Sequence, residues 1–289
     1  MDRNIDIEKC TLCGLCRMVC PAGLFRPGEA AMQFTEGAAR LCIRCGHCIA
    51  ACPEDAIQIQ GLEASQFPPM TGETAGYDQL QNLLLSRRSV RQFEDRPVEK
   101  EMIEKILNAV ATAPSGSNMG PGQVCVLSGR DKIDPMISSM IEFYRRVYRG
   151  MEGMLSRFMY RRMMGKRQFA ALKSFKPIAD RMFEYYDRTG KDPVTWEAPL
   201  LLIFHAPRNA ITCREDAIIA CTYAMLAAHA QGLGTTMCGV IPPFVQQDRD
   251  TRRRLRIPNK NIVVLSLIAG HPKVKFSRGI RRQVEVQWG

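Results

Sequence analysis

The stretch CTLCGLCRMVCP, Cys10 to Pro21, places four cysteines within eleven residues, and CIRCGHCIAACP, Cys42 to Pro53, repeats the same spacing 32 residues later. Each run reads CxxCxxCxxxCP, which is the bacterial spacing for cubane iron–sulfur clusters. In that arrangement three thiolates of one run bind one cluster and the fourth reaches the other cluster. The duplication therefore predicts two [4Fe-4S] clusters near the start of the chain.

Each predicted cluster takes ligands from both runs. The first set is Cys10, Cys13, Cys16 and Cys52, and the second set is Cys42, Cys45, Cys48 and Cys20. Gly14 and Gly46 suit a close approach of backbone to sulfide. Pro21 and Pro53 stop the chain from folding back over the last ligand of each run.

Eight cysteines in CxxC pairs are also compatible with two zinc ions or with disulfides. Zinc sites usually join two separated CxxC pairs, whereas each run here carries three close cysteines, a fourth and a proline. Disulfides suit oxidising compartments, and the opening MDRNIDIEKC carries no apolar signal segment. We therefore expect clusters rather than zinc or disulfides, and a cytoplasmic protein.

The chain has 289 residues, enough for a small metal-binding module and one full-sized core. The stretch LEASQFPPMTGETAG is rich in proline, glycine and small polar residues and reads as a linker. We expect a two-cluster domain at 1–60, a linker at 61–76 and a second domain at 77–289. No run of 18 apolar residues occurs, so we expect no membrane span.

The second domain begins with a predicted helix from Tyr77 that ends in a basic cluster. This cluster consists of Arg87, Arg88, Ser89 and Arg91. Guanidinium groups match phosphate oxygens bidentately, so the cluster is a candidate phosphate clamp. Basic residues at a helix end can also simply compensate the helix dipole.

Further along, the apolar runs QVCVLSG, APLLLIFHAP and NIVVLSLIAGHP predict strands buried on both faces. The stretch VEKEMIEKILNAVATAPSGSN predicts a helix broken at Pro114. CREDAIIACTYAMLAAHAQGLG is apolar almost all round and predicts a central core helix that ends at Gly232 and Gly234.

Four motifs in order, RRSVRQF, APSGSN, AHAQGLGTTMCG and a basic tail after GHP, resemble the flavin-dependent nitroreductase family over about Tyr77 to Arg282. The first 60 residues resemble the two-cluster bacterial ferredoxins. The resemblance implies an α+β fold, with a central mixed sheet flanked by helices, preceded by a small ferredoxin-like domain. It also implies FMN bound at the interface of an intertwined homodimer.

The resemblance also implies roles for single residues. It assigns contacts with the flavin phosphate and ribityl chain to Arg87, Ser89, Arg91 and Arg281. It places Pro114, Ser115 and Asn118 at the ring edge, contributed by the partner subunit. It places backbone N–H groups of Cys238 and Gly239 on the reactive side of the isoalloxazine.

A flavin carries two electrons and each cubane carries one, so two clusters can store the charge of one hydride. We expect an FMN-dependent oxidoreductase in which the clusters exchange electrons with FMN. The expected acceptor is a small organic molecule, namely a nitroaromatic, a quinone or an activated alkene, and an external ferredoxin is a candidate donor. The alternative is a non-catalytic electron carrier or redox sensor that acts on a protein partner. No catalytic residue is assigned.

The segment 135–196 is a predicted helical insertion, rich in methionine and in basic residues. From Arg145 to Arg188 it carries twelve basic and four acidic residues, within a chain of net charge +11. We interpret it as an enlarged lid over the flavin, hence a bulky or apolar substrate; dimer packing is an equal alternative. Docking of an acidic ferredoxin ranks below the lid, and binding to an anionic membrane surface ranks below ferredoxin docking. Nucleic-acid binding is not expected, because the run lacks interleaved base-stacking residues.

Overall fold

The computed structural model describes residues 2–63, 66–70, 72, 74–120 and 122–289, and only the backbone of residues 154, 155, 163, 164 and 168. The chain divides into two compact units. The N-terminal unit extends to Ala75 and includes Ser117–Met119, and the C-terminal unit comprises Gly76–Gly116 and Gly120–Gly289. The predicted linker includes residues 64, 65, 71 and 73, which lie outside the described residues.

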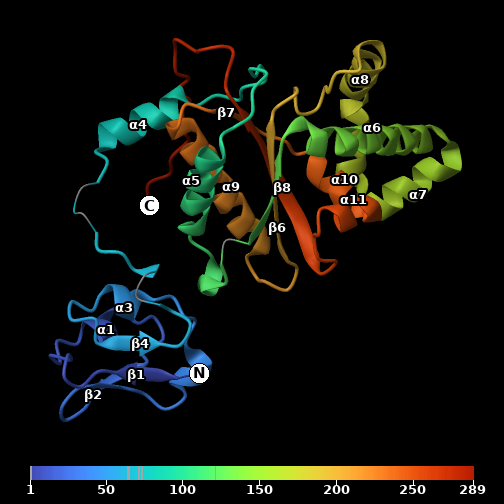
Figure 1. Ribbon diagram of the computed structural model, residues 1–289. Coiled ribbons are helices and arrows are strands. Elements are labelled where there is room, and N and C mark those ends of the chain that lie inside the picture. Colours follow the sequence, from blue (N-terminus) through green and yellow to red (C-terminus); the bar gives the residue numbers. More distant parts are fainter. Residues whose placement is uncertain (1, 64–65, 71, 73, 121) are drawn as a thin grey trace. The chain divides into compact units, whose positions relative to one another are not determined.

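The N-terminal unit contains two short antiparallel strand pairs and three short helices (Figure 1). The strands are β1 (Arg3–Ile5) with β4 (Ile57–Ile59), and β2 (Phe25–Pro27) with β3 (Met32–Phe34). The helices are α1 (Leu15–Val19), α2 (Ala38–Leu41) and α3 (His47–Ala50). Gly14 and Gly46 precede α1 and α3 with φ of 75° and 73°, a left-handed backbone that favours glycine. The two cysteine runs therefore share one backbone geometry.

The C-terminal unit is built on a four-stranded sheet of order β5-β6-β8-β7 (Figure 1). Its strands are β5 (Gln123–Ser128), β6 (Leu200–Pro207), β7 (Gly234–Met237) and β8 (Asn261–Gly270). All three strand pairs are antiparallel, and a parallel bridge between Ser89 and Thr235 adds the segment after α4 (Tyr77–Ser86) to the β7 edge. This parallel bridge gives the sheet its mixed character.

Helices cover both faces of this sheet. On one face lie α5 (Lys100–Ala111) and α9 (Cys213–Ala230); on the other lie α6 (Arg130–Glu152), α10 (Ile241–Gln247) and α11 (Arg249–Arg254) (Figure 1). Side chains of β6 alternate between the two cores, because successive residues of a strand point to opposite faces. Leu201 and Ile203 pack with α6 and α10, whereas Leu202 and Phe204 pack with α5 and α9. The strand is therefore buried on both faces, as predicted.

The remaining helices follow α6 along the chain. They are α7 (Met154–Met164) and α8 (Lys166–Thr189). A single turn of 3-10 helix, Gly116–Asn118, lies earlier in the chain, before β5. The segment predicted as a helical insertion thus contains α7, α8 and most of α6, which begins at Arg130. Within the described residues, no helix combines the length and the apolar character that crossing a bilayer requires.

Two features of the fold differ from the sequence-based reading. Residues Gly234–Met237 form strand β7, which was not among the predicted strands, and Thr235 and Thr236 pair with Ala269 and Ile268. Helix α9 was predicted to be a central core helix, yet Ile218 and Tyr223 are exposed on it in the single chain.

Candidate functional site

The eight cysteines of the two runs gather around two small cavities in the N-terminal unit. One cavity is lined by Cys10, Cys13, Cys16 and Cys52. The other is lined by Cys20, Cys42, Cys45 and Cys48. None of the eight forms a disulfide. Each cavity thus draws three cysteines from one run and one from the other run.

Apolar side chains complete both cavities. Ile5, Met32 and Ile57 line the first, and Phe25, Phe34 and Ile59 line the second. Burial raises the pKa of the Cys16 thiol, and it raises that of Cys48 to about 11. A thiolate in such surroundings requires a compensating positive charge, which bound iron provides.

Backbone N–H groups point at four of these sulfurs. Leu24, Met32 and Arg44 donate to the Sγ atoms of Cys20, Cys10 and Cys42 over 3.4 Å. Ala56 donates to Sγ of Cys52 over 3.3 Å. Hydrogen bonds to sulfur stabilise the thiolate and set the potential of an iron–sulfur cluster. The donor set therefore fits the predicted clusters, and the role of each cysteine as a ligand stays a prediction.

In the C-terminal unit, the segment that carries the predicted phosphate clamp follows α4 and lies along the edge strand β7. Arg87 ends α4, and Val90 N–H donates to the Thr235 carbonyl over 2.9 Å. The guanidinium of Arg88 donates to the Arg278 carbonyl over 3.0 Å, so it holds the C-terminal tail. The guanidinium of Arg91 lies 5.1 Å from the centre of the Trp196 ring.

The other predicted flavin contacts come from two further segments of the chain, residues 114–118 and the C-terminal tail. Ser115 Oγ accepts a hydrogen bond from Gly120 N–H over 2.8 Å, and Pro114 is exposed beside it. Asn118 belongs to the short segment that groups with the N-terminal unit. Arg281 is exposed in the tail.

The polar backbone groups of Cys238 are already occupied. Its N–H donates to the Ser266 carbonyl over 2.9 Å, and its carbonyl accepts from Ser266 Oγ over 2.6 Å. Burial, with a smaller effect from Asp192, raises the pKa of its thiol to about 12, so the thiol is neutral near pH 7. Of the two residues predicted to face the reactive edge, Gly239 is the one that is exposed and borders a cavity.

That cavity is large and apolar. It has a volume of about 720 Å³ and lies between α6, α7, α8 and the loop from β7 to α10. Every side chain on its wall is uncharged among the residues whose side chains the structure describes, and several of them are aromatic. The wall includes Met140, Phe143, Tyr144, Tyr148, Tyr160, Phe175, Met182, Phe183, Val194 and Val240.

Two polar contacts fix the wall of this cavity. Tyr144 donates its hydroxyl to the Val240 carbonyl over 2.6 Å, which ties α6 to the loop that carries Gly239. Burial raises the pKa of Tyr144. The second contact is an ion pair between the guanidinium of Arg130 and the carboxylate of Asp192, over 3.0 Å.

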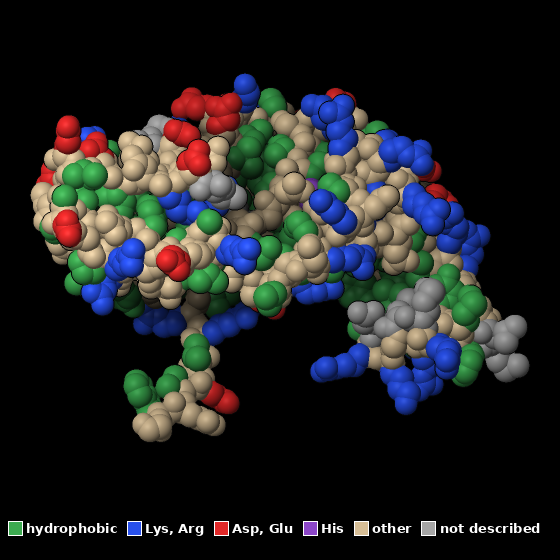
Figure 2. Space-filling model, turned by 90° about the horizontal axis from the view of Figure 1, so that it is seen from below, with side chains coloured by type: hydrophobic (Ala, Val, Ile, Leu, Met, Phe, Trp, Pro, Cys, Tyr) green, Lys and Arg blue, Asp and Glu red, His purple; other side chains and the backbone are tan. Residues whose placement is uncertain are grey.

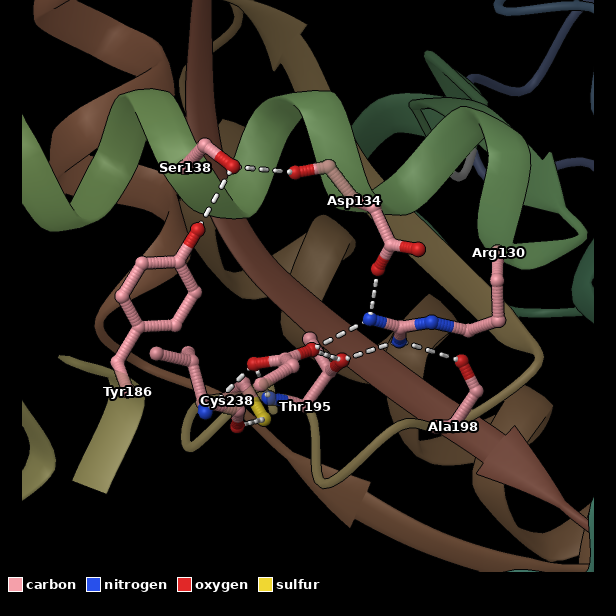
Figure 3. A network of polar contacts seen from close by, with 9 residues as sticks. Arg130, Asp134, Ser138, Tyr186, Thr195, Ala198 and Cys238 are labelled. Carbon is pink, nitrogen blue, oxygen red and sulfur yellow. Dashed lines mark hydrogen bonds and ion pairs between the residues drawn. The ribbon is translucent and has the colours of Figure 1, made fainter. Parts of the chain in front are cut away.

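Arg130 and Asp192 together hold the turn that leads from α8 back to the sheet. Arg130 also donates to Thr195 Oγ1 over 2.9 Å, to the Ala198 carbonyl over 3.1 Å and to the Asp134 carboxylate (Figure 3). Asp192 Oδ1 accepts from Val194 N–H over 2.7 Å and from Thr195 N–H over 3.0 Å. Because Val194 lines the cavity, this buried network sets one side of it.

Sequence reasoning missed Arg130 and Asp192. It did name Tyr144, Tyr148 and Tyr160 as residues of the insertion that could reach the pocket, and all three line the cavity. The order Asp192, Pro193, Val194, Thr195 is typical of a turn in which the aspartate side chain accepts from the following backbone. That signal predicts the turn but not its arginine partner, which lies 62 positions earlier in the chain.

The N-terminal unit has two cavities with four cysteines each, and the C-terminal unit has a large apolar cavity beside its sheet. These features are typical of redox proteins that hold more than one cofactor. Residues 84–271 match the nitroreductase family model, so the chain belongs to the nitroreductase family. Residues 9–57 match the model of the 4Fe-4S dicluster domain. The second match favours clusters over the zinc and disulfide alternatives.

Relatives and solved structures agree with this membership. A 4-nitrobenzoate reductase from Nocardioides is 28% identical over 202 residues, which are 65% of this chain and 78% of that protein. An iodotyrosine deiodinase from Thermotoga neapolitana is 25% identical over 213 residues, 72% of this chain and 97% of that protein. A nitroreductase structure with bound FMN from Bacteroides fragilis matches with a TM-score of 0.51 at 16% identity, over 73% of this chain and 96% of that chain. This last likeness concerns the fold alone.

Proposed function

We propose that the protein is an FMN-dependent oxidoreductase in which two [4Fe-4S] clusters pass electrons to FMN for the reduction of a neutral organic acceptor. The observation that carries the acceptor class is the cavity beside Gly239, whose walls are uncharged. When bound, FMN converts between one-electron and two-electron chemistry. The acceptor classes remain nitroaromatics, quinones and activated alkenes.

The proposed cluster ligands are the two sets of cysteines that the cavities bring together. Cys10, Cys13, Cys16 and Cys52 would hold one cluster, and Cys20, Cys42, Cys45 and Cys48 the other. The free thiols and the N–H groups aimed at four sulfurs support this assignment.

The proposed FMN phosphate contacts are Arg87, Ser89, Arg91 and Arg281. We do not propose a phosphate contact for Arg88, because its guanidinium already donates to the Arg278 carbonyl in the tail that carries Arg281. The exposed N–H of Gly239 would face the ring, whereas the occupied N–H of Cys238 would not. Pro114, Ser115 and Asn118 would reach the flavin from a partner subunit.

We propose a homodimer, in line with this division of the site. Large apolar side chains remain exposed on α4, on α9 and on the tail of the single chain. They include Leu80, Leu84, Ile218, Tyr223 and Trp288. Covering these side chains is favourable by about 25 cal/mol per Å² of apolar surface.

The uncharged cavity wall also bears on the acceptor. An acceptor that enters the cavity with a carboxylate would take this charge out of water. The described wall offers no cation to pair with it, so this transfer is costly in free energy. We therefore expect neutral acceptors to be used in preference to anionic ones. Tyr148 and Tyr160 supply hydroxyl groups on the wall, and neither is assigned a proton transfer.

Electron flow is tested with anaerobic protein and a reduced ferredoxin as one-electron donor. Bleaching of the flavin absorbance should follow bleaching of the cluster absorbance, and turnover should begin when a neutral nitroarene or quinone is added. A Cys13→Ser variant that retains FMN should lose flavin reduction by ferredoxin. Protein that lacks FMN, or a flavin that stays oxidised while the clusters are reduced, would contradict the proposal. Reduced flavin without turnover on any small acceptor would instead favour the electron-carrier alternative.

A further inference from the structure

The helical tip formed by residues 153–179, called here the α7–α8 tip, carries only positive charge. It contains seven basic residues and no carboxylate. Lys176 pairs with Glu152 over 3.5 Å and Asp180 over 2.9 Å, which flank the tip. The other six are exposed, and the described residues offer them no ion pair. They are Arg157, Arg161, Arg162, Lys166, Arg167 and Lys173.

Large apolar side chains are exposed among these cations. Phe158 is 67% exposed and Met159 59% exposed on α7, and Ile178 is 50% exposed on α8. Phe158 shares a helix face with Arg161 and Arg162, since residues three and four positions apart are neighbours on a helix. Figure 2 shows blue basic and green apolar side chains together at the lower right of the view, where α7 lies. Aromatic and aliphatic side chains exposed among basic residues are typical of helices that bind at a membrane interface.

The apolar cavity opens at this same tip. Ala171 and Phe175 line the cavity and are also exposed, Phe175 by 41%, so they form part of its rim. Tyr160 of α7 also lines the cavity. An apolar molecule would therefore pass the tip to reach the cavity.

We propose that the α7–α8 tip docks on the surface of an anionic lipid bilayer and that the acceptor enters the cavity from the membrane. Cations attract anionic headgroups, and aromatic and aliphatic side chains insert at the boundary between headgroups and acyl chains. An acidic protein would pair with the cations but would leave Phe158, Ile178 and the apolar rim without matching contacts. The acceptor class is a neutral lipophilic molecule, such as a quinone with a long hydrocarbon chain. This acceptor assignment rests on the proposed function, whereas the docking does not.

Docking is tested by sedimentation of the holo-protein with vesicles. The vesicles contain either phosphatidylcholine alone or phosphatidylcholine with about 30% phosphatidylglycerol, which makes the surface anionic. We expect binding only to the anionic vesicles, and weaker binding at 0.5 M than at about 0.1 M salt. A triple variant, Arg157→Gln, Arg161→Gln and Arg162→Gln, should bind on the order of 100-fold more weakly, since each surface cation contributes about fivefold. Phe158→Ser should also weaken binding, and the effect should persist at high salt.

The matched control removes three exposed arginines elsewhere. Arg249→Gln, Arg253→Gln and Arg254→Gln on α11 change the net charge equally and should leave vesicle binding unchanged. Both triple variants should keep cluster and flavin spectra and should keep turnover of a water-soluble acceptor. Equal binding to neutral vesicles, an equal loss in both triple variants, or capture of an acidic ferredoxin without vesicle binding would overturn the docking. Vesicle binding without any turnover would leave the docking intact and contradict the proposed function.

Discussion

Replacement of Asp192 by asparagine tests the buried network that holds the cavity wall. The side chain of Asp192 is only 3% exposed and pairs with Arg130, whereas Asp134 pairs with the same guanidinium but is 59% exposed. Removing one partner of a buried ion pair costs about 3–5 kcal/mol, and an exposed pair contributes about 0–1 kcal/mol. Arg130 keeps its bonds to Thr195 and Ala198 in the variant, so we expect the lower value, about 3 kcal/mol.

Thermal unfolding of the two variants measures this difference. For a domain of this size, 1 kcal/mol lowers the midpoint by about 2–4 °C. Asp192→Asn should therefore unfold about 6–12 °C below the parent protein, and Asp134→Asn no more than about 4 °C below it. Because asparagine keeps an oxygen that can accept from Val194 N–H, KM for a bulky acceptor should change little. Equal shifts for the two variants would refute the assignment of a structural role to the buried pair.

Three further outcomes follow from the cavity and its surroundings. Ala179 is buried and lines the cavity, so Ala179→Phe should raise KM about tenfold or more for bulky acceptors and change it little for nitrobenzene, as steady-state kinetics would show. The ratio of kcat/KM for nitrobenzene to that for 4-nitrobenzoate should exceed about 100, and a preference for the carboxylate would contradict an uncharged site. Burial raises the pKa of Cys238 and of Cys221 to about 12, so the folded state keeps protons that the unfolded state loses above about pH 9. The free energy of unfolding should therefore fall between about pH 9 and 12, and Cys221→Ala with Cys238→Ala should make that fall shallower in denaturant titrations.

Several parts of the fold follow from local sequence signals. Spacing alone predicted the cysteine sets, and continuous apolar runs predicted β5, β6 and β8, because these patterns act over a few residues. Strand β7 was missed because it is only four residues long and lacks a continuous apolar run, although its two threonines favour a strand. Only its pairing with β8 shows it to be part of the sheet.

The cavity wall could not be predicted in the same way. Arg130 and Asp192, or Tyr144 and Val240, are brought together by tertiary packing over 62 and 96 positions of the chain. The occupied N–H of Cys238 depends likewise on Ser266 in another strand. The methionine-rich composition of the insertion indicated an adaptable apolar surface, but only the packed helices show that its aromatic side chains enclose space next to Gly239.

The crosswise sharing of cysteines has a consequence for how the N-terminal unit can be assembled or lost. Neither half of the duplication contains a complete set of four thiols for its own cavity, since Cys52 serves the first and Cys20 the second. Deletion of either half removes a thiol from the surviving cavity as well. Iron content should therefore change in an all-or-none manner, and a lineage that discarded one half of the repeat would have to replace a ligand before it could retain a single working cluster.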